Sequence, residues 1–455
     1  MSGPKRGVEL NLIKYNSGFD KHDNIFIIEK MTGETDMAEI KTIIGNGAVN
    51  RLPEVVQGFG AKKAFVFADV NTDKAAGGLV CDILDNAEIA YSKYVMQNEK
   101  PTPDEHTVGS VMMHFDAKCD LIVAVGSGVI NDVSKILANI SGLPYVIVAT
   151  APSMDGYASA TSSMERDGLK VSLPSKCADV IIGDVDIMKN APDHLLSAGL
   201  GDMLAKYVSI CEWRIANIII GETYFEPIAQ KVREALKRCV DNSAGLMKRE
   251  DEAVKAVFEG LIICGQAMAE AGSSRPASGV EHYFSHVWDM RALEFGTKAE
   301  LHGTQCAVGT LLSAKLYEQI KKMTPDREKA MKYAAAFDHD KWEADLRRFL
   351  GNAADAMIAL DNKEKKYDLA KHAQRFDVIE ARWADILKVI EEELPGSEAL
   401  EACLIEIKAP TNVEALGVDP VTLPETFRAT KDIRDKYVLS RLAWDLGVLD
   451  ELVVG

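Results

Sequence analysis

The chain of 455 residues contains 69 Asp and Glu residues against 52 Lys and Arg residues, a formal net charge of −17. Its length predicts about two or three domains with ample core, and scattered basic residues in an acidic chain argue against nucleic acid and anionic membranes as partners. Eight cysteines without a C-x-x-C spacing are typical of unpaired thiols in a reducing compartment, so we expect a cytoplasmic protein.

Residues 1–39 form an N-terminal extension to the patterned part of the chain. This segment has no apolar stretch of the kind that a signal peptide requires. Elsewhere no apolar run reaches the roughly 20 residues needed to cross a bilayer. We therefore expect neither a secretion signal nor a membrane span.

Residues 40–188 alternate short β-branched runs with helical patterns, whereas nearly every long segment of residues 189–455 has helical periodicity. We therefore predict an α/β domain with a parallel sheet over residues 40–188, followed by an all-helical domain over residues 189–455. Four runs are continuous and apolar, as strands buried on both faces are: residues 63–70, 120–128, 144–152 and 178–186.

The first of these strands ends at Asp69, which Asn71 and Thr72 follow closely. A carboxylate at the carboxyl end of a parallel strand can accept hydrogen bonds from the ribose hydroxyls of a dinucleotide, and it repels a 2′-phosphate. Asp69 therefore favours NAD over NADP. The alternative is an acid that only stabilises a turn.

The second strand runs into a glycine-containing turn and a helix, in the sequence VGSGVINDVSK. Glycines at such a junction let backbone amides approach a pyrophosphate at the helix N-terminus. The spacing differs from G-x-G-x-x-G, and a tight turn without a ligand is the alternative. We predict a dinucleotide-binding domain whose loop residues are Gly126, Gly128, Val129, Ile130, Asn131 and Asp132.

A second loop, residues 149–164, follows the third strand and is rich in hydroxyl groups. Hydroxyl-rich loops after strands are often solvated turns. Open α/β sheets, however, bind ligands at the carboxyl ends of their strands, and this loop follows the glycine loop at the same edge. We therefore expect it to border the nucleotide.

Residues 271–310 have the residue types of half a metal site. Ser278 and Glu281 are spaced as a capping box, which predicts a helix from residue 280 to residue 293. His282 and His286 then share one face of this helix. His302 lies in the first turn of the next predicted helix, so two imidazoles from neighbouring helices can meet.

A third ligand is predicted at Asp202, which follows two glycines and is interpreted as lying at the start of a helix, where the dipole favours an acid. Two His and one carboxylate, with a position open for substrate, form a Lewis-acid site for Zn²⁺, Fe²⁺ or a similar ion. The alternative for each residue is structural. The predicted metal ligands are Asp202, His282 and His302.

Three stretches resemble the metal-site motifs of the sn-glycerol-1-phosphate dehydrogenase family. They are AGLGDMLAKY (198–207), SSRPASGVEHYFSHVWDM (273–290) and LHGTQCAVGT (301–310). That family belongs to the superfamily of iron-containing alcohol dehydrogenases, glycerol dehydrogenases and dehydroquinate synthases. The similarity runs from about residue 43 to about residue 316 and resumes at KDIRDKYVLSRLAWDLG (431–447). It implies the dehydroquinate synthase-like fold, which agrees with the α/β-then-helical pattern.

The resemblance implies roles for further residues. Thr150, Ser153 and Ser159 would contact the dinucleotide, and Asp155 the substrate. His286 would bind the substrate phosphate or relay a proton, with a structural partner of His282 as the alternative. Asp202 would serve substrate and catalysis as well as the metal. One departure is Ser127, where the family's phosphate loop usually has the middle glycine of Gly-Gly-Gly. Separately from the resemblance, Lys206 lies one turn beyond Asp202 and could bind the substrate phosphate; the alternative is a solvated helix lysine.

The implied reaction interconverts dihydroxyacetone phosphate and glycerol 1-phosphate with NAD(H), or alternatively NADP(H), in a homodimer that holds one Zn²⁺, Ni²⁺ or Fe²⁺. A dehydroquinate synthase-like lyase and a non-catalytic sensor of nucleotide and sugar phosphate are the alternatives. Residues 317–405 extend beyond the family's usual chain. We expect this C-terminal extension to pack against the helical domain or a neighbouring subunit.

Overall fold

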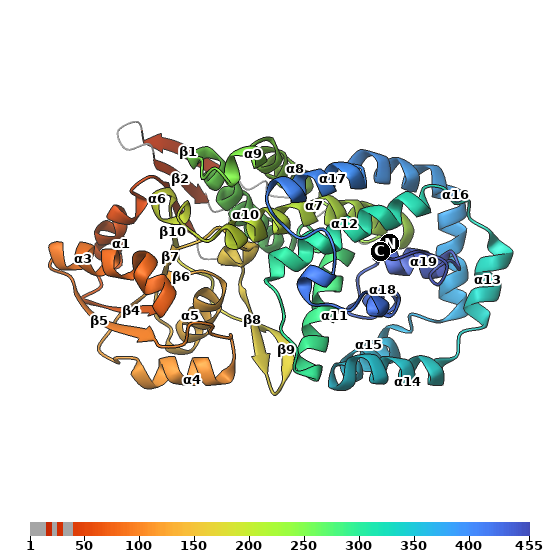
Figure 1. Cartoon of the computed structure of the whole chain (residues 1–455), viewed down its shortest axis with the longest axis horizontal. Helices are drawn as coiled ribbons and strands as arrows, with labels where there is room; N and C mark the ends of the chain where they lie inside the picture. The colour runs from red at the N-terminus through yellow and green to blue at the C-terminus, as the bar shows by residue number, and fades with distance from the viewer. Residues whose placement is uncertain (1–14, 21–24, 31–39) are drawn as a thin grey trace, which may run out of the picture.

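The computed structural model describes residues 15–20, 25–30 and 40–455. An α/β half and a helical half lie side by side (Figure 1). The expectation about a signal peptide falls largely on residues outside this described part. Within the described part, no helix is long and apolar enough to cross a membrane, and all eight cysteines are present there as unpaired thiols.

The main sheet has eight strands in the order β1-β2-β3-β10-β7-β6-β4-β5. The six from β3 to β5 in this order are parallel, whereas β1 and β2 add antiparallel at one edge. Their bounds are β1 (Tyr15–Asp20), β2 (Ile25–Lys30), β3 (Lys41–Gly45), β4 (Lys63–Asp69), β5 (Ala90–Met96), β6 (Leu121–Gly126), β7 (Tyr145–Ala149) and β10 (Val180–Asp184).

The four predicted strands are β4, β6, β7 and β10, which confirms the parallel α/β class. Alternate side chains of these buried strands enter two separate apolar layers, as a period of two requires. Phe65 and Ile122 face one layer, and Val66 and Val123 face the other. The sheet is covered on both faces, and its helices are α1 (Leu52–Gly58), α2 (Val70–Thr72), α3 (Gly78–Asn86), α4 (Glu105–His114), α5 (Gly128–Ser141) and α6 (Val185–Met188).

The helical half confirms the periodicity of the sequence and is built around the long helix α7 (Asp193–Ile220), which packs against α8, α10, α12 and α16. The other helices are α8 (Glu226–Asp241), α9 (Ser243–Leu246), α10 (Asp251–Ala271), α11 (Val280–Phe295), α12 (His302–Ile320), α13 (Arg327–Ala335), α14 (His339–Leu350), α15 (Ala354–Glu364), α16 (Leu369–Glu393), α17 (Ser397–Glu406), α18 (Leu423–Thr430) and α19 (Leu439–Asp445). The C-terminal extension packs onto this half through α16 and α17.

A hairpin of β8 (Thr161–Arg166) and β9 (Leu169–Pro174) corrects the prediction of a single loop over residues 149–164. Its turn is Asp167-Gly168, with φ of 53° and 72°, and an Asp-Gly pair is a strong hairpin signal in a sequence. The strands were missed because they are short and largely polar. The hairpin reaches from the α/β half to α11 (Figure 1).

Candidate metal centre

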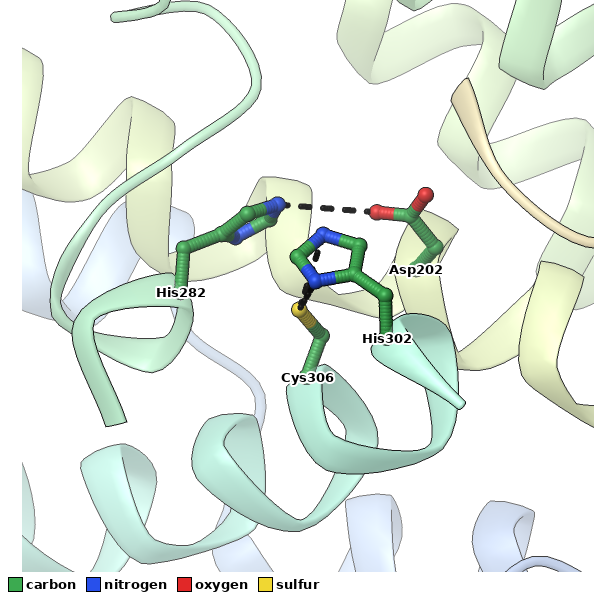
Figure 2. A group of neighbouring side chains, drawn as sticks. All are labelled: Asp202, His282, His302 and Cys306. Carbon is green, nitrogen blue, oxygen red and sulfur yellow. Dashed lines mark hydrogen bonds and ion pairs between the residues drawn. The ribbon is translucent and has the colours of Figure 1, made fainter. Parts of the chain in front are cut away.

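Three helices bring the predicted ligands together. Asp202 comes from α7, His282 from α11 and His302 from α12, and Cys306 of α12 joins them (Figure 2). One ligand atom from each of the four lies within 4.8 Å of the others. Asp202 Oδ1 is 3.7 Å from His282 Nε2, and the two imidazole centroids are 4.9 Å apart.

Both imidazoles are oriented by a hydrogen bond at Nδ1. Glu281 Oε1 lies 2.8 Å from Nδ1 of His282, and the Ser285 hydroxyl lies 3.1 Å from Nδ1 of His302. A carboxylate can only accept, so His282 donates from Nδ1 and its Nε2 keeps a lone pair. Metal-binding histidines are commonly held in this way.

Glu281 does not belong to the predicted capping box. The N-cap of α11 is Gly279 rather than Ser278, and no side chain caps it. Glu281 Oε1 instead accepts a 2.6 Å hydrogen bond from the Gly279 amide while it holds His282. The helix start was predicted correctly, but the carboxylate serves the imidazole as well as the helix end.

The position of Asp202 in its helix and the role of the glycines before it also differ from the prediction. Helix α7 begins at Asp193, so Asp202 lies well inside it and the helix dipole does not explain the acid. A Cβ at Gly199 would lie 1.7 Å from the carbonyl oxygen of Pro152, and one at Gly303 would lie 2.0 Å from that of Ala198. The glycines therefore let α7 approach α12 and the loop after β7 backbone to backbone.

Asp202 is fully buried and has two hydrogen-bond partners. Its Oδ1 accepts from Lys206 Nζ at 2.8 Å, and its Oδ2 accepts from the Asp155 amide at 2.9 Å. Lys206 Nζ also donates to Asp155 Oδ2 at 2.8 Å and to the Ala277 carbonyl at 3.2 Å. The three N–H groups of Lys206 are thus all used, which leaves none for a substrate phosphate.

Charges near Asp202 outweigh its burial. Burial raises the pKa of Asp202, but the charges of Lys206, His302 and His282 lower it to about 2. Burial lowers the pKa of Lys206, but Asp155 and Asp202 hold it well above its ordinary value. The carboxylate therefore remains ionised and ready to bind a cation.

Cys306 was missed by sequence reasoning. Its Sγ lies 3.5 Å from His302 Nε2, and burial raises the pKa of its thiol well above the ordinary value. The i,i+4 spacing from His302, the same criterion that paired His282 with His286, could have found it. Alone in an apolar helix, a cysteine usually belongs to the core.

The four donors fit a divalent transition metal. Zinc bonds of roughly 2.0 to 2.3 Å in a tetrahedron place neighbouring donors about 3.3 to 3.8 Å apart, and the Asp202–His282 and Cys306–His302 distances are 3.7 and 3.5 Å. Two imidazoles, a carboxylate and a sulfur suit Zn²⁺, Fe²⁺ or Ni²⁺ better than Mg²⁺ or Ca²⁺.

His286 lies outside this group but close to it. Its ring centroid is 6.4 Å from that of His302. Burial, together with the nearby Arg434, His302, His282 and Lys170, holds the pKa of His286 well below its ordinary value. It is therefore an uncharged imidazole at neutral pH.

The predicted nucleotide residues gather at the carboxyl edge of three adjacent strands. Asp69 ends β4, Gly126 ends β6 and Thr150 follows β7. The Thr150 amide donates to the Gly126 carbonyl at 3.1 Å. A Cβ at Gly126 would lie 2.5 Å from Cβ of Ile130. This glycine is needed for the close strand-to-helix turn.

Side chains after Gly128 are largely used within the fold. Ile130 is buried, and Asn131 donates to the Gly156 carbonyl and accepts from Tyr145. Asp132 pairs with Lys135 at 3.4 Å. Val129 is partly buried. A ligand at the start of α5 would therefore meet backbone amides rather than these side chains.

The loop after β7 links the sheet edge to the metal centre. Thr150 and Ser153 are buried directly after the strand. Asp155 contacts both Lys206 and Asp202, whereas the hydroxyl of the partly exposed Ser159 lies 3.0 Å from that of Thr161. Asp155 is thus next to the centre and Ser159 further along the loop.

Asp69 stabilises a turn as well as ending a strand. Its Oδ1 accepts from the amides of Asn71 and Thr72 at 2.7 and 2.9 Å. In return, the Asp69 amide donates to Thr72 Oγ1 at 3.0 Å. The turn alternative is therefore realised. A ribose contact would have to use the other carboxylate oxygen.

Comparison with known proteins identifies the family of the chain. The sequence model of the family described as "Iron-containing alcohol dehydrogenase" matches residues 43–192. The chain is 31% identical over 278 residues to "Glycerol-1-phosphate dehydrogenase [NAD(P)+]" of Halalkalibacterium halodurans, covering 60% of this chain and 70% of that protein. The enzyme of the same name from Geobacillus thermodenitrificans is 25% identical over 402 residues, with 88% and 90% covered.

Solved structures share the fold. Glycerol dehydrogenase from Schizosaccharomyces pombe superposes with a TM-score of 0.58 at 17% identity, covering 90% of this chain and 88% of that one. Sulfoacetaldehyde reductase from Bifidobacterium kashiwanohense, in complex with NAD⁺, gives 0.58 at 14% identity, covering 92% and 98%.

Fold and relatives together define the class: the chain is an NAD(P)-dependent oxidoreductase of the iron-containing alcohol dehydrogenase type. Within that class it belongs to the glycerol-1-phosphate dehydrogenase family, because two relatives of that name are 31% and 30% identical, with 70% and 77% of their length covered. The resemblance drawn from the sequence motifs is thereby confirmed.

Proposed function

We propose that the protein interconverts dihydroxyacetone phosphate and sn-glycerol 1-phosphate. It uses NAD(H) in preference to NADP(H) and one divalent metal ion, in the cytoplasm and as a homodimer. The observation that carries this proposal is the convergence of Asp202, His282 and His302 beside the loop that follows β7. In an open α/β sheet that edge is where a dinucleotide binds.

Asp202, His282 and His302 would hold the ion, and Cys306 adds a sulfur donor. A bound divalent cation supplies Lewis-acid polarisation of the C2 carbonyl. Glu281 and Ser285 keep the two imidazoles aimed at it. These hydrogen bonds fix the donor atoms before substrate arrives, so less reorganisation is needed during the reaction.

The reaction also needs a proton at the C2 oxygen. When bound, NADH would supply the hydride for C2 in the reductive direction, and the C2 oxygen would then gain a proton. His286 is an uncharged imidazole that is partly open to solvent beside the centre, so it can relay that proton. Lys206 keeps Asp202 and Asp155 in place and offsets part of their negative charge.

The test is NADH oxidation by the metal-loaded protein with dihydroxyacetone phosphate, followed by chiral analysis of the product. Net oxidation to glycerol 1-phosphate is expected. A dehydroquinate synthase-like lyase returns its hydride within one turnover and gives no net oxidation, and a sensor binds without turnover. Tight binding of both ligands with no NADH consumed would therefore overturn the proposal.

The ligand set has its own test. Asp202→Ala, His282→Ala and His302→Ala should each lose metal and activity while retaining the fold, as measured by metal analysis and circular dichroism. A variant that keeps one ion per chain would remove that residue from the ligand set.

A further inference from the structure

Three cations border the candidate metal centre on the side of His286. Lys170 lies on β9 of the hairpin, and Arg434 and Lys436 lie in the segment between α18 and α19. Arg434 Nη2 is 3.4 Å from the Ser172 hydroxyl, so this segment touches the hairpin. Strand β9 in turn packs against α11, which carries His286.

Ring contacts lead from Lys436 toward the candidate metal centre. Lys436 Nζ lies 6.0 Å from the ring centroid of Tyr283. The Tyr283 and His286 centroids are 6.2 Å apart, and those of His286 and His302 are 6.4 Å apart. Arg434 and Lys170 are linked to the same region through strand β9, which carries Lys170, contacts Arg434 at Ser172 and packs against α11.

These cations are weakly paired, unlike most lysines and arginines of this chain. In the part of the chain that the structure describes, neither Arg434 nor Lys436 has a carboxylate within ion-pair distance. Arg434 is exposed, and Lys436 donates only to the Ser278 carbonyl, at 2.7 Å. Lys170 has a long contact of 3.5 Å to Asp289. The charge of Arg434 is therefore left for a ligand. Burial, together with the charges of Arg275 and Arg434, lowers the pKa of Lys436 to about 7, and a bound phosphate would favour its protonated form.

We propose that Lys170, Arg434 and Lys436 bind the phosphate group of the substrate. The inference rests on the proposed function, because it assumes that the substrate is a small ketone or alcohol phosphate. Lys206 cannot take this role, since its three donors hold Asp155, Asp202 and a carbonyl. A guanidinium can bind two phosphate oxygens at once, and ammonium groups add charge.

The proposal also assigns a structural role to the C-terminal extension. Lys366, in the extension, donates to the Arg434 carbonyl at 2.7 Å. Asp432, two residues before Arg434, is buried and accepts from Trp342 Nε1 at 3.0 Å and from the Tyr367 hydroxyl at 2.5 Å. The extension thus anchors the backbone that carries Arg434 and Lys436 and positions the phosphate-binding side chains.

The test compares Arg434→Gln and Lys436→Gln with the wild-type holoenzyme. The KM for dihydroxyacetone phosphate should rise about 10- to 100-fold, the range expected for one lost charge-assisted hydrogen bond. The KM for NADH and the turnover of dihydroxyacetone, which lacks the phosphate, should stay within about twofold. Arg166→Gln, an exposed change on the same hairpin, is the matched control and should alter none of these values.

The outcomes separate the two proposals. If dihydroxyacetone phosphate is turned over and neither variant changes its KM, the phosphate site is wrong and the proposed function stands. If the wild type does not oxidise NADH with this substrate, the proposed function fails, and calorimetric titration with inorganic phosphate then tests the cations. Weaker binding by Arg434→Gln would retain them as an anion site, and equal binding would exclude them.

Discussion

Cys306 places a sulfur among donors that are otherwise the two imidazoles and the carboxylate expected from the sequence. We expect the cobalt-loaded protein to show a near-ultraviolet absorption from thiolate to Co²⁺, because the thiol lies 3.5 Å from His302 Nε2. Cys306→Ser should lose this band and bind metal about tenfold or more weakly, while a change at the distant Cys81 should do neither. Absence of the band in the wild type would place Cys306 outside the coordination sphere.

Asp69 combines a turn with a predicted cofactor contact, so Asp69→Asn is a sharper test than alanine. An amide oxygen can still accept from the Asn71 and Thr72 amides, while the negative charge that repels a 2′-phosphate is removed. We expect kcat/KM for NADPH relative to NADH to rise about tenfold or more, with the melting temperature unchanged. An unaltered ratio would remove Asp69 from the cofactor site.

The site residues that the sequence could predict are those whose type is chemically specific. Paired histidines and an acid pointed to Asp202, His282 and His302, whereas a single cysteine in an apolar helix did not stand out. The glycine loop was predicted from its position after a strand, but a pyrophosphate site made of backbone amides would say little about the neighbouring side chains. Asn131 was therefore predicted as a cofactor residue, yet its side chain holds Gly156 and Tyr145.

At the scale of elements, the crossing of α7 with α12 brings the predicted ligands Asp202 and His302 together. A Cβ at Gly303 would lie 2.0 Å from the Ala198 carbonyl oxygen, next to His302. Gly303→Ala should therefore separate the helices, lower stability by about 1 to 3 kcal/mol and reduce metal content. Thermal unfolding and metal analysis would measure both effects.

Gly109 provides the matched control for that substitution. It lies inside α4, and a Cβ there would meet nothing within 4 Å. Gly109→Ala should leave metal content unchanged and stabilise the protein by up to about 1 kcal/mol, because alanine favours a helix. If both alanine variants behaved alike, the close helix crossing would not be what positions His302.

The elements that the sequence predicted are those with a clear burial pattern. Strands β6, β7 and β10 are buried at every residue and read as continuous apolar runs. Strand β5 lies at the sheet edge and is only half-buried, so it gave no such run. Helix α7 is buried on nearly all sides, so it has no polar stripe to mark its length, and its start was placed too late.

At the scale of the whole molecule, the metal centre joins three helices to the loop that follows β7, and hence the helical half to the sheet. Asp155 of that loop contacts Asp202 and Lys206 across this junction. Periodicity cannot show such long-range convergence, since residues 202, 282 and 302 are far apart in the chain. The domain boundary near residue 188 stays a prediction, although it falls where α6 ends.

Metal removal should therefore lower stability without unfolding the protein. An ion that binds only the folded state adds about 2.7 kcal/mol at a concentration 100 times its Kd. For 455 residues unfolding as one unit, with an unfolding entropy of about 2.1 cal/mol/K per residue, that corresponds to roughly 3 °C in Tm. Lys206 already balances the charge of Asp202, so the apoprotein is not left with an isolated buried carboxylate. Calorimetry with and without chelator measures the shift, and His302→Ala should show none. An equal shift in that variant would place the stabilising ion elsewhere.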